Sequence, residues 1–285
     1  VELVEQLLRE QAPHLADLPL SPAGTGWDNG IYRLGETMAV RLPSRDVADE
    51  LLTNEQRWLP ILARAVSVQV PEPIFIGAPS ATFAHPWSVV PWFPGTAASD
   101  LDVAQRNSCM EGLLDFFIDL HVQALPGAPE NPYRGLAINR REFDESFRRA
   151  VAGRQDAAAL LERWLAWRGV PDWDAGDVWV HGDAHPGNLI LDASGDLAAV
   201  IDWGDVTAGD PASDLATIWM TFDAPTRETF IERYSAATGV SDATWTRAKA
   251  WALRLAALFA SSDARLPNLA HIGEETLERL LAEKP

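Results

Sequence analysis

The sequence is poor in cysteine, in lysine and in long apolar runs, and each shortage excludes a class of protein or site. Its one cysteine, Cys109, excludes an internal disulfide and a zinc site built from several thiolates, and it fits a reducing compartment. Cys109 lies beside the apolar positions of an expected helix, with no histidine near it in sequence, so we expect a packed thiol. No run of about 18 apolar residues, the length that a membrane-spanning helix needs, occurs.

The N-terminal segment VELVEQLLREQAPHL is typical of an amphipathic helix with interspersed acidic residues. A secretory signal begins with basic residues and continues with an apolar stretch, which this segment does not do. The chain has 285 residues, of which 47% are hydrophobic, so it can bury a large core in one large domain or two lobes. We therefore expect a globular, cytoplasmic protein with no membrane partner, and the sequence indicates no oligomeric state.

Positive charge is scarce, since 23 lysines and arginines stand against 41 aspartates and glutamates and give a formal net charge of −18. Nucleic-acid binding needs clustered basic residues that displace counterions, so we expect no nucleic-acid partner. The acidic excess would attract a cationic small molecule, although a need for solubility explains the same excess equally well.

The first part of the chain is rich in expected strands. Glycine-punctuated strand formers run from Leu18 to Leu42, and a second strand pair is expected around residues 73–77 and 87–93. Between them, the apolar spacing of residues 45–63 predicts a helix that Pro60 should kink or shorten. The proline-rich and glycine-containing stretch 91–100 then separates this part from a helix-rich part.

The second part alternates expected helices with three short apolar strands. Apolar residues at helical spacing precede His121, which falls on the buried stripe and is interpreted as a hydrogen-bonded core histidine. Residues 141–168 are predicted to be helical. The strands VWVHGD, NLILD and LAAVIDW follow, and then Asp210 is expected to cap a helix that has Pro211 in its first turn. The pattern predicts an α+β fold.

Polar residues stand directly at the ends of these strands, in HGDAHPGNLILD (181–192) and AVIDWGD (199–205). Burying so many carboxylates and amides costs free energy unless they are paired or bind a metal. Phosphoryl transfer needs a carboxylate for the hydroxyl proton, oxygen ligands for Mg²⁺ and a cation on the phosphates. Asp183 can supply the first, and Asn188 and Asp202 can supply the second.

The sequence H-G-D-x-x-x-x-N followed by I-D-W resembles the catalytic and metal loops of the aminoglycoside phosphotransferase family, which are relatives of protein kinases. The resemblance implies a bilobal protein-kinase-like fold, with a strand-rich N-lobe at 1–93 and a mostly helical C-lobe at 94–285. It implies Asp183 as catalytic base, Asn188 and Asp202 as Mg²⁺ ligands, and His181 as a residue that holds the loop. Asp214 is expected to brace the catalytic loop by a hydrogen bond.

On the nucleotide side, GTGWDNGIYRLG resembles the hairpin that covers the phosphates in this family, although its glycines do not match G-x-G-x-x-G and a plain hairpin explains them as well. The expected contacts of this hairpin are Gly26, Asn29 and Gly30. Trp92 and Phe93, near the expected hinge at 89–95, could flank the nucleotide base.

The departure from the family pattern is the missing phosphate-binding lysine, because the only lysines are Lys249 and Lys284, far downstream. Arg41 in TMAVRLP takes that position, and a guanidinium can bridge phosphate oxygens bidentately. Glu55 on the following helix is the candidate partner that orients Arg41, with a solvent-facing glutamate as the alternative.

The spacing His181-x-Asp183-x-His185 leaves a second class open, a zinc-dependent hydrolase. Such a site needs further ligands, and none of the other histidines has a suitable spacing: His14, His85, His121 and His271. In a phosphotransferase, His185 and Asp205 are possible substrate contacts.

The sequence therefore predicts a phosphotransferase that moves the γ-phosphate of ATP or GTP, with Mg²⁺, to a hydroxyl of a small and cationic acceptor. An antibiotic such as an aminoglycoside is the leading acceptor. A metabolite such as an amino alcohol or sugar remains open, as does a non-catalytic nucleotide-binding relative. The candidates for contacting amines are Asp263, Glu274, Glu275 and Glu278.

Overall fold

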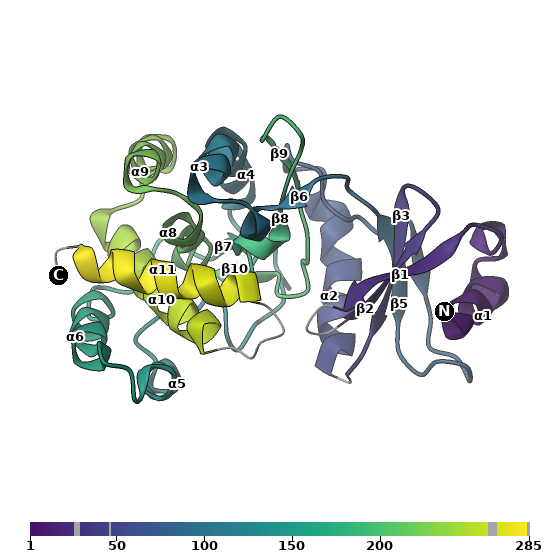
Figure 1. Cartoon of the computed structure of the whole chain (residues 1–285), viewed down its shortest axis with the longest axis horizontal. Helices are drawn as coiled ribbons and strands as arrows, with labels where there is room; N and C mark the ends of the chain where they lie inside the picture. The colour runs from purple at the N-terminus through teal and green to yellow at the C-terminus, as the bar shows by residue number, and fades with distance from the viewer. Residues whose placement is uncertain (26–28, 46, 262–266, 284–285) are drawn as a thin grey trace.

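The computed structural model describes residues 1–25, 29–45, 47–261 and 267–283, and it divides into a strand-rich part and a helical part that lie side by side (Figure 1). The strand-rich part is a five-stranded antiparallel sheet in the order β1-β2-β3-β5-β4. Its strands are β1 (Leu20–Thr25), β2 (Asn29–Leu34), β3 (Met38–Pro43), β4 (Phe75–Gly77) and β5 (Trp87–Pro91). The strands expected at 18–42, 73–77 and 87–93 are thus present.

The sheet has its own small core. Helix α1 (Glu2–Gln11) lays Val4, Leu7 and Leu8 against Val40 and Trp87 of the sheet, as its amphipathic pattern predicts. Gly35, at φ +59°, makes the turn between β2 and β3, a conformation that favours glycine.

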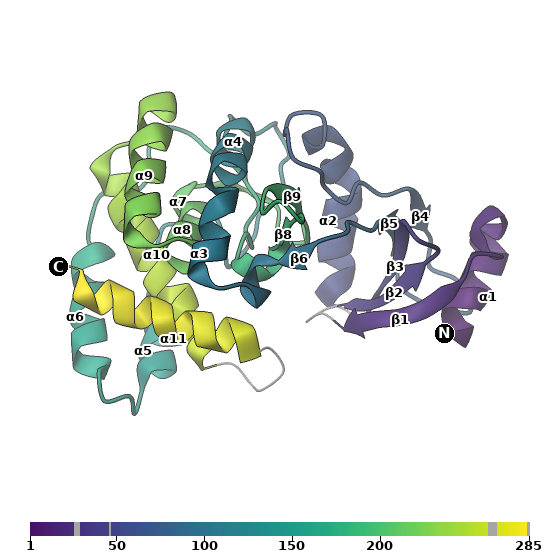
Figure 2. The same ribbon diagram turned by 45° about the horizontal axis from the view of Figure 1, so that its top comes forward.

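Helix α2 (Val47–Leu62) connects the two parts, and Figure 2 shows it between the sheet and the helical part. Its last turns place Trp58, Leu59 and Leu62 in the large core of the helical part. Pro60 lies in the last turn, so the helix ends two residues after it, in line with the expected shortening. Because α2 packs on the second core, its Glu55 is held at the boundary of the two parts.

The helical part surrounds two small β-structures that carry the polar loops. The strands β6 (Thr96–Ala97), β8 (Leu189–Leu191) and β9 (Leu197–Val200) form one sheet, and β7 (Val178–Val180) pairs with β10 (Thr207–Gly209). The helices are α3 (Val103–Arg106), α4 (Met110–Leu120), α5 (Arg141–Val151), α6 (Ala157–Trp167), α7 (Ala212–Leu215), α8 (Thr217–Thr221), α9 (Ala224–Thr238), α10 (Asp242–Ala260) and α11 (Pro267–Ala282). None of the described helices is long and apolar enough to cross a membrane.

Two sequence expectations change in detail. Residues 141–168 form two helices, α5 and α6, because Gly153 adopts a left-handed conformation at φ +82° and interrupts the helical hydrogen bonds. Asp210 accepts a hydrogen bond from the Ala212 amide at 3.0 Å, as a capping residue does, but it also forms a buried ion pair with Arg247 at 2.6 Å. The sequence did not reveal that ion pair.

Two interpretations of buried residues are confirmed. Cys109 is fully buried, and burial raises the pKa of its thiol to about 12. The His121 side chain is buried against Phe117 and hydrogen-bonds to Tyr234 and Asp214, as expected of a core histidine.

Candidate active site

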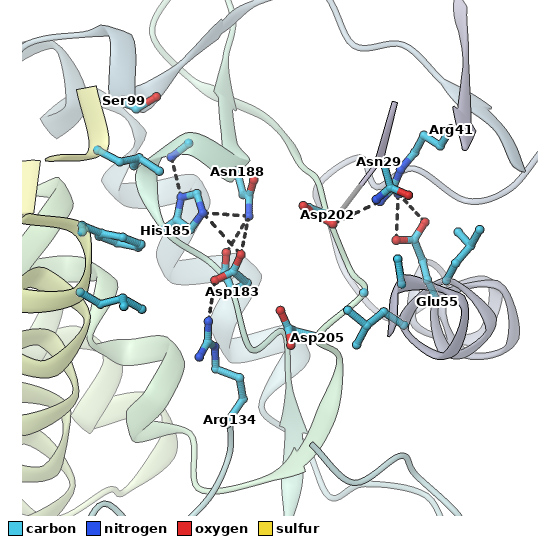
Figure 3. Close-up of a pocket in the computed structure, with 18 of the residues that line it drawn as sticks. Asn29, Arg41, Glu55, Ser99, Arg134, Asp183, His185, Asn188, Asp202 and Asp205 are labelled. Atoms are coloured by element: carbon cyan, nitrogen blue, oxygen red, sulfur yellow. Dashed lines mark hydrogen bonds and ion pairs between the residues drawn. The ribbon is translucent and has the colours of Figure 1, made fainter. Parts of the chain in front are cut away.

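A cavity of about 480 Å³ lies between the sheet, α2 and the polar loops, within the size range of small-molecule sites (Figure 3). It brings together residues from strands, helices and loops that are up to 240 positions apart in sequence, from Asn29 to Leu269. The predicted site residues that line it are Asn29, Arg41, Glu55, Asp183, His185, Asn188, Asp202 and Asp205.

The loop after β7 is held by one buried carboxylate. Asp214 accepts hydrogen bonds from the backbone N–H groups of His181 at 2.7 Å and Gly182 at 2.9 Å. Gly182 has φ +87°, and a Cβ at this position would lie 2.4 Å from the Asp205 carbonyl oxygen. Any other residue would therefore push apart the two loops that carry Asp183 and Asp205.

His181 ties the same loop to the loop after β9. Its Nδ1 accepts from the Asp183 backbone N–H at 3.1 Å, and its Nε2 donates to the Ile201 carbonyl oxygen at 3.2 Å. Burial lowers the pKa of His181, more than the surrounding carboxylates raise it, so the ring is neutral and protonated on Nε2. Asp183 and Asp202 are thereby held in fixed relation to each other.

The carboxylate of Asp183 faces two basic side chains (Figure 3). Arg134 donates to it at 3.1 Å and also to the Gly182 carbonyl oxygen, and His185 Nε2 lies 3.4 Å from its second oxygen. Burial would raise the pKa of Asp183, but the charges and hydrogen bonding of His185 and Arg134 outweigh burial and hold that pKa well below its usual range. Asp183 is therefore ionised.

Asn188 and Asp202 present oxygen atoms suited to a hard cation. Asn188 donates its Nδ2 to the Asp183 carbonyl oxygen at 2.8 Å, which turns its Oδ1 away from that bond. Asp202 is the one described non-glycine residue with a positive φ, at +64°, and its side chain is 51% exposed. Such strain at a cavity persists only where the surrounding structure enforces it.

These oxygens fit Mg²⁺ bound in the way that nucleotide enzymes bind it. The described residues contain no ready-made cluster of three or more His, Cys, Asp or Glu ligands. Mg²⁺ is commonly held by only one or two protein oxygens, with substrate phosphates and water completing the shell. The carboxylate of Asp202 and the amide oxygen of Asn188 satisfy that requirement.

At the opposite side of the cavity, Arg41 is buried with two counterions. Its Nη1 donates to both oxygens of Glu55, at 2.6 and 2.8 Å, and its Nη2 donates to Asp202 at 3.1 Å. Burial lowers the pKa of Arg41, but the charges of Glu55 and Asp202 more than offset that effect and raise it. Glu55 is fully buried, so the alternative of a solvent-facing glutamate is wrong.

Asp205 lies at the bottom of the cavity, where Asn131 donates to it at 2.6 Å. Burial raises the pKa of Asp205, and the neighbouring Asp183 adds to this while Arg134 opposes it. Sequence reasoning missed Arg134 and Asn131, because both come from the irregular segment between α4 and α5, which carries no motif.

Several residues that were predicted to contact the nucleotide do not line the cavity. Gly30 sits within β2 opposite Leu42. The Arg33 guanidinium covers Trp92, 4.4 Å from its ring centre, and Phe93 lines a different cavity. Gly26 and Asp263 lie outside the described residues.

The glutamates expected to contact amines are not on the cavity wall, and two of them are occupied. Glu274 forms an ion pair with Arg154 at 2.7 Å. Glu275 is shared by Arg279 at 2.9 Å and Arg106 at 3.6 Å. Glu278 is exposed on α11.

The zinc alternative lacks its ligands in the described part of the chain. Both ring nitrogens of His181 are already hydrogen-bonded, so neither has a lone pair free for a metal. The Nδ1 of His185 accepts from the Gly187 N–H at 3.0 Å. The two histidines therefore do not form a zinc site with Asp183.

Comparison with known proteins decides the family. Residues 19–251 match the model of the phosphotransferase enzyme family, and this range includes all the residues predicted to act in catalysis, metal binding or nucleotide binding. The chain belongs to this phosphotransferase family. A curated relative, the uncharacterized protein YcbJ of Bacillus subtilis, is 25% identical over 172 residues, which is 52% of this chain and 54% of YcbJ. That match thus spans about half the length of the relative.

Solved structures agree on the fold of this family member. The GDP complex of aminoglycoside 2'-phosphotransferase-IIIa has a TM-score of 0.69 at 19% identity, covering 98% of this chain and 97% of that chain. The macrolide 2'-phosphotransferase MphH of Brachybacterium faecium has a TM-score of 0.61 at 20% identity and covers all of both chains. The fold is therefore the protein-kinase-like fold that the sequence predicts.

Proposed function

We propose that this phosphotransferase moves the γ-phosphate of ATP or GTP to a hydroxyl group of a small molecule. The observation that carries the proposal is the convergence of Asp183, Asn188 and Asp202 with the Arg41–Glu55 pair around one cavity. Phosphoryl transfer depends on positioning and charge stabilisation, and these side chains are the groups it needs. Nucleotide-bound phosphotransferases with the same fold support the donor class.

Each side chain has a proposed task. Asp183, ionised at physiological pH, accepts a hydrogen bond from the acceptor hydroxyl and takes its proton as the phosphate transfers. Arg41, oriented by Glu55, binds the α- and β-phosphates in place of the usual lysine. Mg²⁺, held by Asn188 and Asp202, would neutralise charge on the phosphate oxygens.

We further propose that residues 1–93 cover the nucleotide and that residues 94–285 carry the catalytic loops and the acceptor region. The nucleotide base would extend from the cavity toward the connection between the two parts. Asn29, which lines the cavity, would face the phosphates. His185 and Asp205 would face the acceptor.

The acceptor has two candidate classes. Phosphotransferases solved with kanamycin, gentamicin and streptomycin share the fold, which supports an antibiotic acceptor. A phosphorylated metabolite is the alternative, and the lining of the acceptor region bears on that choice in the next subsection.

Phosphoryl transfer and nucleotide hydrolysis by wild type and Asp183→Asn test the proposal, with ATP and GTP compared. We expect a loss of about 100-fold or more in rate, with the nucleotide dissociation constant largely kept. Asp192→Asn is the matched control, because Asp192 accepts backbone bonds in the exposed β8–β9 turn, outside the cavity. Equal rates in wild type and Asp183→Asn, with nucleotide still bound, would favour the non-catalytic relative.

A further inference from the structure

One arginine of α10, the helix that contributes Leu258 and Phe259 to the cavity wall, has no counterion in the described part of the chain. Arg254 lies on α10, and its Nε and Nη1 are enclosed without any hydrogen-bond partner among the residues that the structure describes. Its guanidinium lies over the ring of Phe143, 4.3 Å from the ring centre, and 5.3 Å from that of Trp251. The two aromatic rings hold the planar group in place but do not neutralise its charge.

The most deeply buried arginines of the described chain are neutralised. The four that are fully buried each meet a carboxylate: Arg41 with Glu55, Arg106 with Glu275, Arg227 with Glu283 and Arg247 with Asp210. An enclosed charge without a partner is costly, and removing a partner from a buried pair is strongly destabilising. Arg254 thus differs from these four arginines. Arg163 also has no carboxylate partner in the described chain, but its Nη2 donates to the Leu281 carbonyl oxygen at 3.1 Å, whereas the Nε and Nη1 of Arg254 have no partner there.

Arg254 nevertheless remains a cation at neutral pH. Burial, and next the charge of Arg134, lower its pKa to about 10, still well above physiological pH. The protein therefore keeps a positive charge at a place where nothing in its described part balances it.

Arg254 lies on the helix that forms part of the cavity wall. One helical turn further along α10, Leu258 and Phe259 line the cavity, and Phe259 packs edge-on against His185. Arg134, whose charge acts on Arg254, donates to the carboxylate of Asp183. Arg254 itself does not line the cavity, but it lies one helical turn before wall residues of α10 and close enough to Arg134 for their charges to interact.

We propose that Arg254 binds an anionic group of the acceptor, a carboxylate or a phosphate, while a hydroxyl of the same molecule faces Asp183. This inference rests on the proposed phosphotransferase function and specifies its acceptor class. Charge-assisted hydrogen bonds from a guanidinium to a carboxylate or phosphate are strong, and the aromatic rings keep this guanidinium in one orientation.

The proposal favours an acidic metabolite over the polycationic aminoglycoside expected from sequence. The glutamates that were candidates for binding amines, Glu274 and Glu275, are already paired with arginines. In the cavity itself, Asp183 and Asp202 are paired with Arg134 and Arg41. Asp205 accepts from Asn131 and lies near enough to Arg134 to raise the pKa of that arginine. Beyond Arg134, the charge on α10 that lacks a counterion in the described chain is positive.

Calorimetric binding in the presence of saturating ADP and Mg²⁺ tests this inference, because ADP occupies the donor site and keeps phosphates out of it. The test compounds are glycerate, glycerol phosphate and the neutral glyceramide, which differ in the charged group. We expect one of the two anions to bind at least about tenfold more tightly than glyceramide, and which anion does so distinguishes carboxylate from phosphate.

Two variants assign the preference to Arg254. Arg254→Met should erase it, and Arg254→Lys should restore part of it, provided that both melt as cooperatively as wild type. Arg57→Met is the matched control, since Arg57 also covers an aromatic ring, Trp58 at 4.9 Å, but lies outside the cavity wall. That variant should keep the full preference.

The outcomes separate this inference from the function on which it rests. No anion preference in wild type, or an unchanged preference in Arg254→Met, overturns the anionic acceptor. Rates that do not depend on Asp183 overturn the phosphotransferase proposal instead, whatever the anion binding shows. Binding and turnover are therefore independent measurements.

Discussion

Arg41 lines the cavity and Arg254 lies on α10, one helical turn before cavity-wall residues, and the two arginines differ in what balances their charge. Arg41 is buried with Glu55 and Asp202 within hydrogen-bonding distance. Arg254 is enclosed by Phe143 and Trp251 and has no carboxylate partner in the described chain. A neutralised charge is part of the folded structure and is positioned before the nucleotide arrives. The charge of Arg254, which lacks a partner in the described chain, is the one for which we propose a ligand as the counterion.

The largest effect on stability should come from removing the main counterion of Arg41, which would bring it closer to the state of Arg254. Glu55→Ala removes the main counterion of Arg41 and leaves a buried cation with Asp202 alone. We expect a loss of about 3–5 kcal/mol in the free energy of unfolding, together with weaker nucleotide binding. Denaturant unfolding and nucleotide titration measure the two effects.

Glu50→Ala is the control for that change, because Glu50 lies on the same helix but is exposed. Its free energy of unfolding should stay within about 0.5 kcal/mol of wild type. If Glu55→Ala were equally mild, Arg41 would not depend on Glu55, and the contrast between the two arginines would disappear.

His181 is also a buried base, but unlike Arg41 and Arg254 it is neutral in the native protein. Its pKa is lowered by burial from an ordinary value of 6.5, so the unfolded chain takes up a proton before the native protein does. Below pH 6.5 the stability therefore falls as pH falls, by at most about 1.4 kcal/mol per pH unit from this group. Above pH 6.5 this group gives no slope.

Unfolding of wild type and His181→Gln between pH 5 and 8 would measure that contribution. The variant should lose part of the slope below pH 6.5, whatever its overall stability. Parallel curves for the two proteins would mean that His181 is charged in the native state, in conflict with its two hydrogen bonds.

The smallest stability effect should come from Arg254 itself. Arg254→Met keeps the aliphatic stem and removes a charge that has no partner. We expect its free energy of unfolding to change by less than about 1 kcal/mol, because only the contact with the aromatic rings is lost. Arg41→Met, compared under the same denaturant conditions, should cost several times more. Equal losses would show that Arg254 has a counterion after all.

The features of the site that could be predicted from sequence are those that short local motifs specify. HGDAHPGN and IDW each form one loop after a strand, so their spacing alone indicated that Asp183, Asn188 and Asp202 share a site. Arg41 and Glu55 followed because a strand and the helix after it are adjacent in sequence. The fold then followed from the family resemblance.

Arg134 and Arg254 could not be predicted, because their roles depend on contacts between segments that are distant in sequence. Arg134 is 49 positions from Asp183, and it comes from a loop with no regular pattern. Arg254 lies in a helix where its spacing with Trp251 and Leu258 is that of ordinary core packing. Its lack of a counterion becomes visible only when every carboxylate nearby has been assigned to another partner. The net charge of −18 favoured a cationic acceptor, whereas the pairing of individual charges in the fold is the basis of the anionic acceptor that we propose.

A structure with a non-hydrolysable nucleotide and Mg²⁺ tests the central claim most directly. We predict a metal ion bound to the Asp202 carboxylate and the Asn188 amide oxygen, with Arg41 on the α- and β-phosphates and the γ-phosphate facing Asp183. A nucleotide bound outside this cavity, or a metal ion that contacts neither Asn188 nor Asp202, would contradict the account.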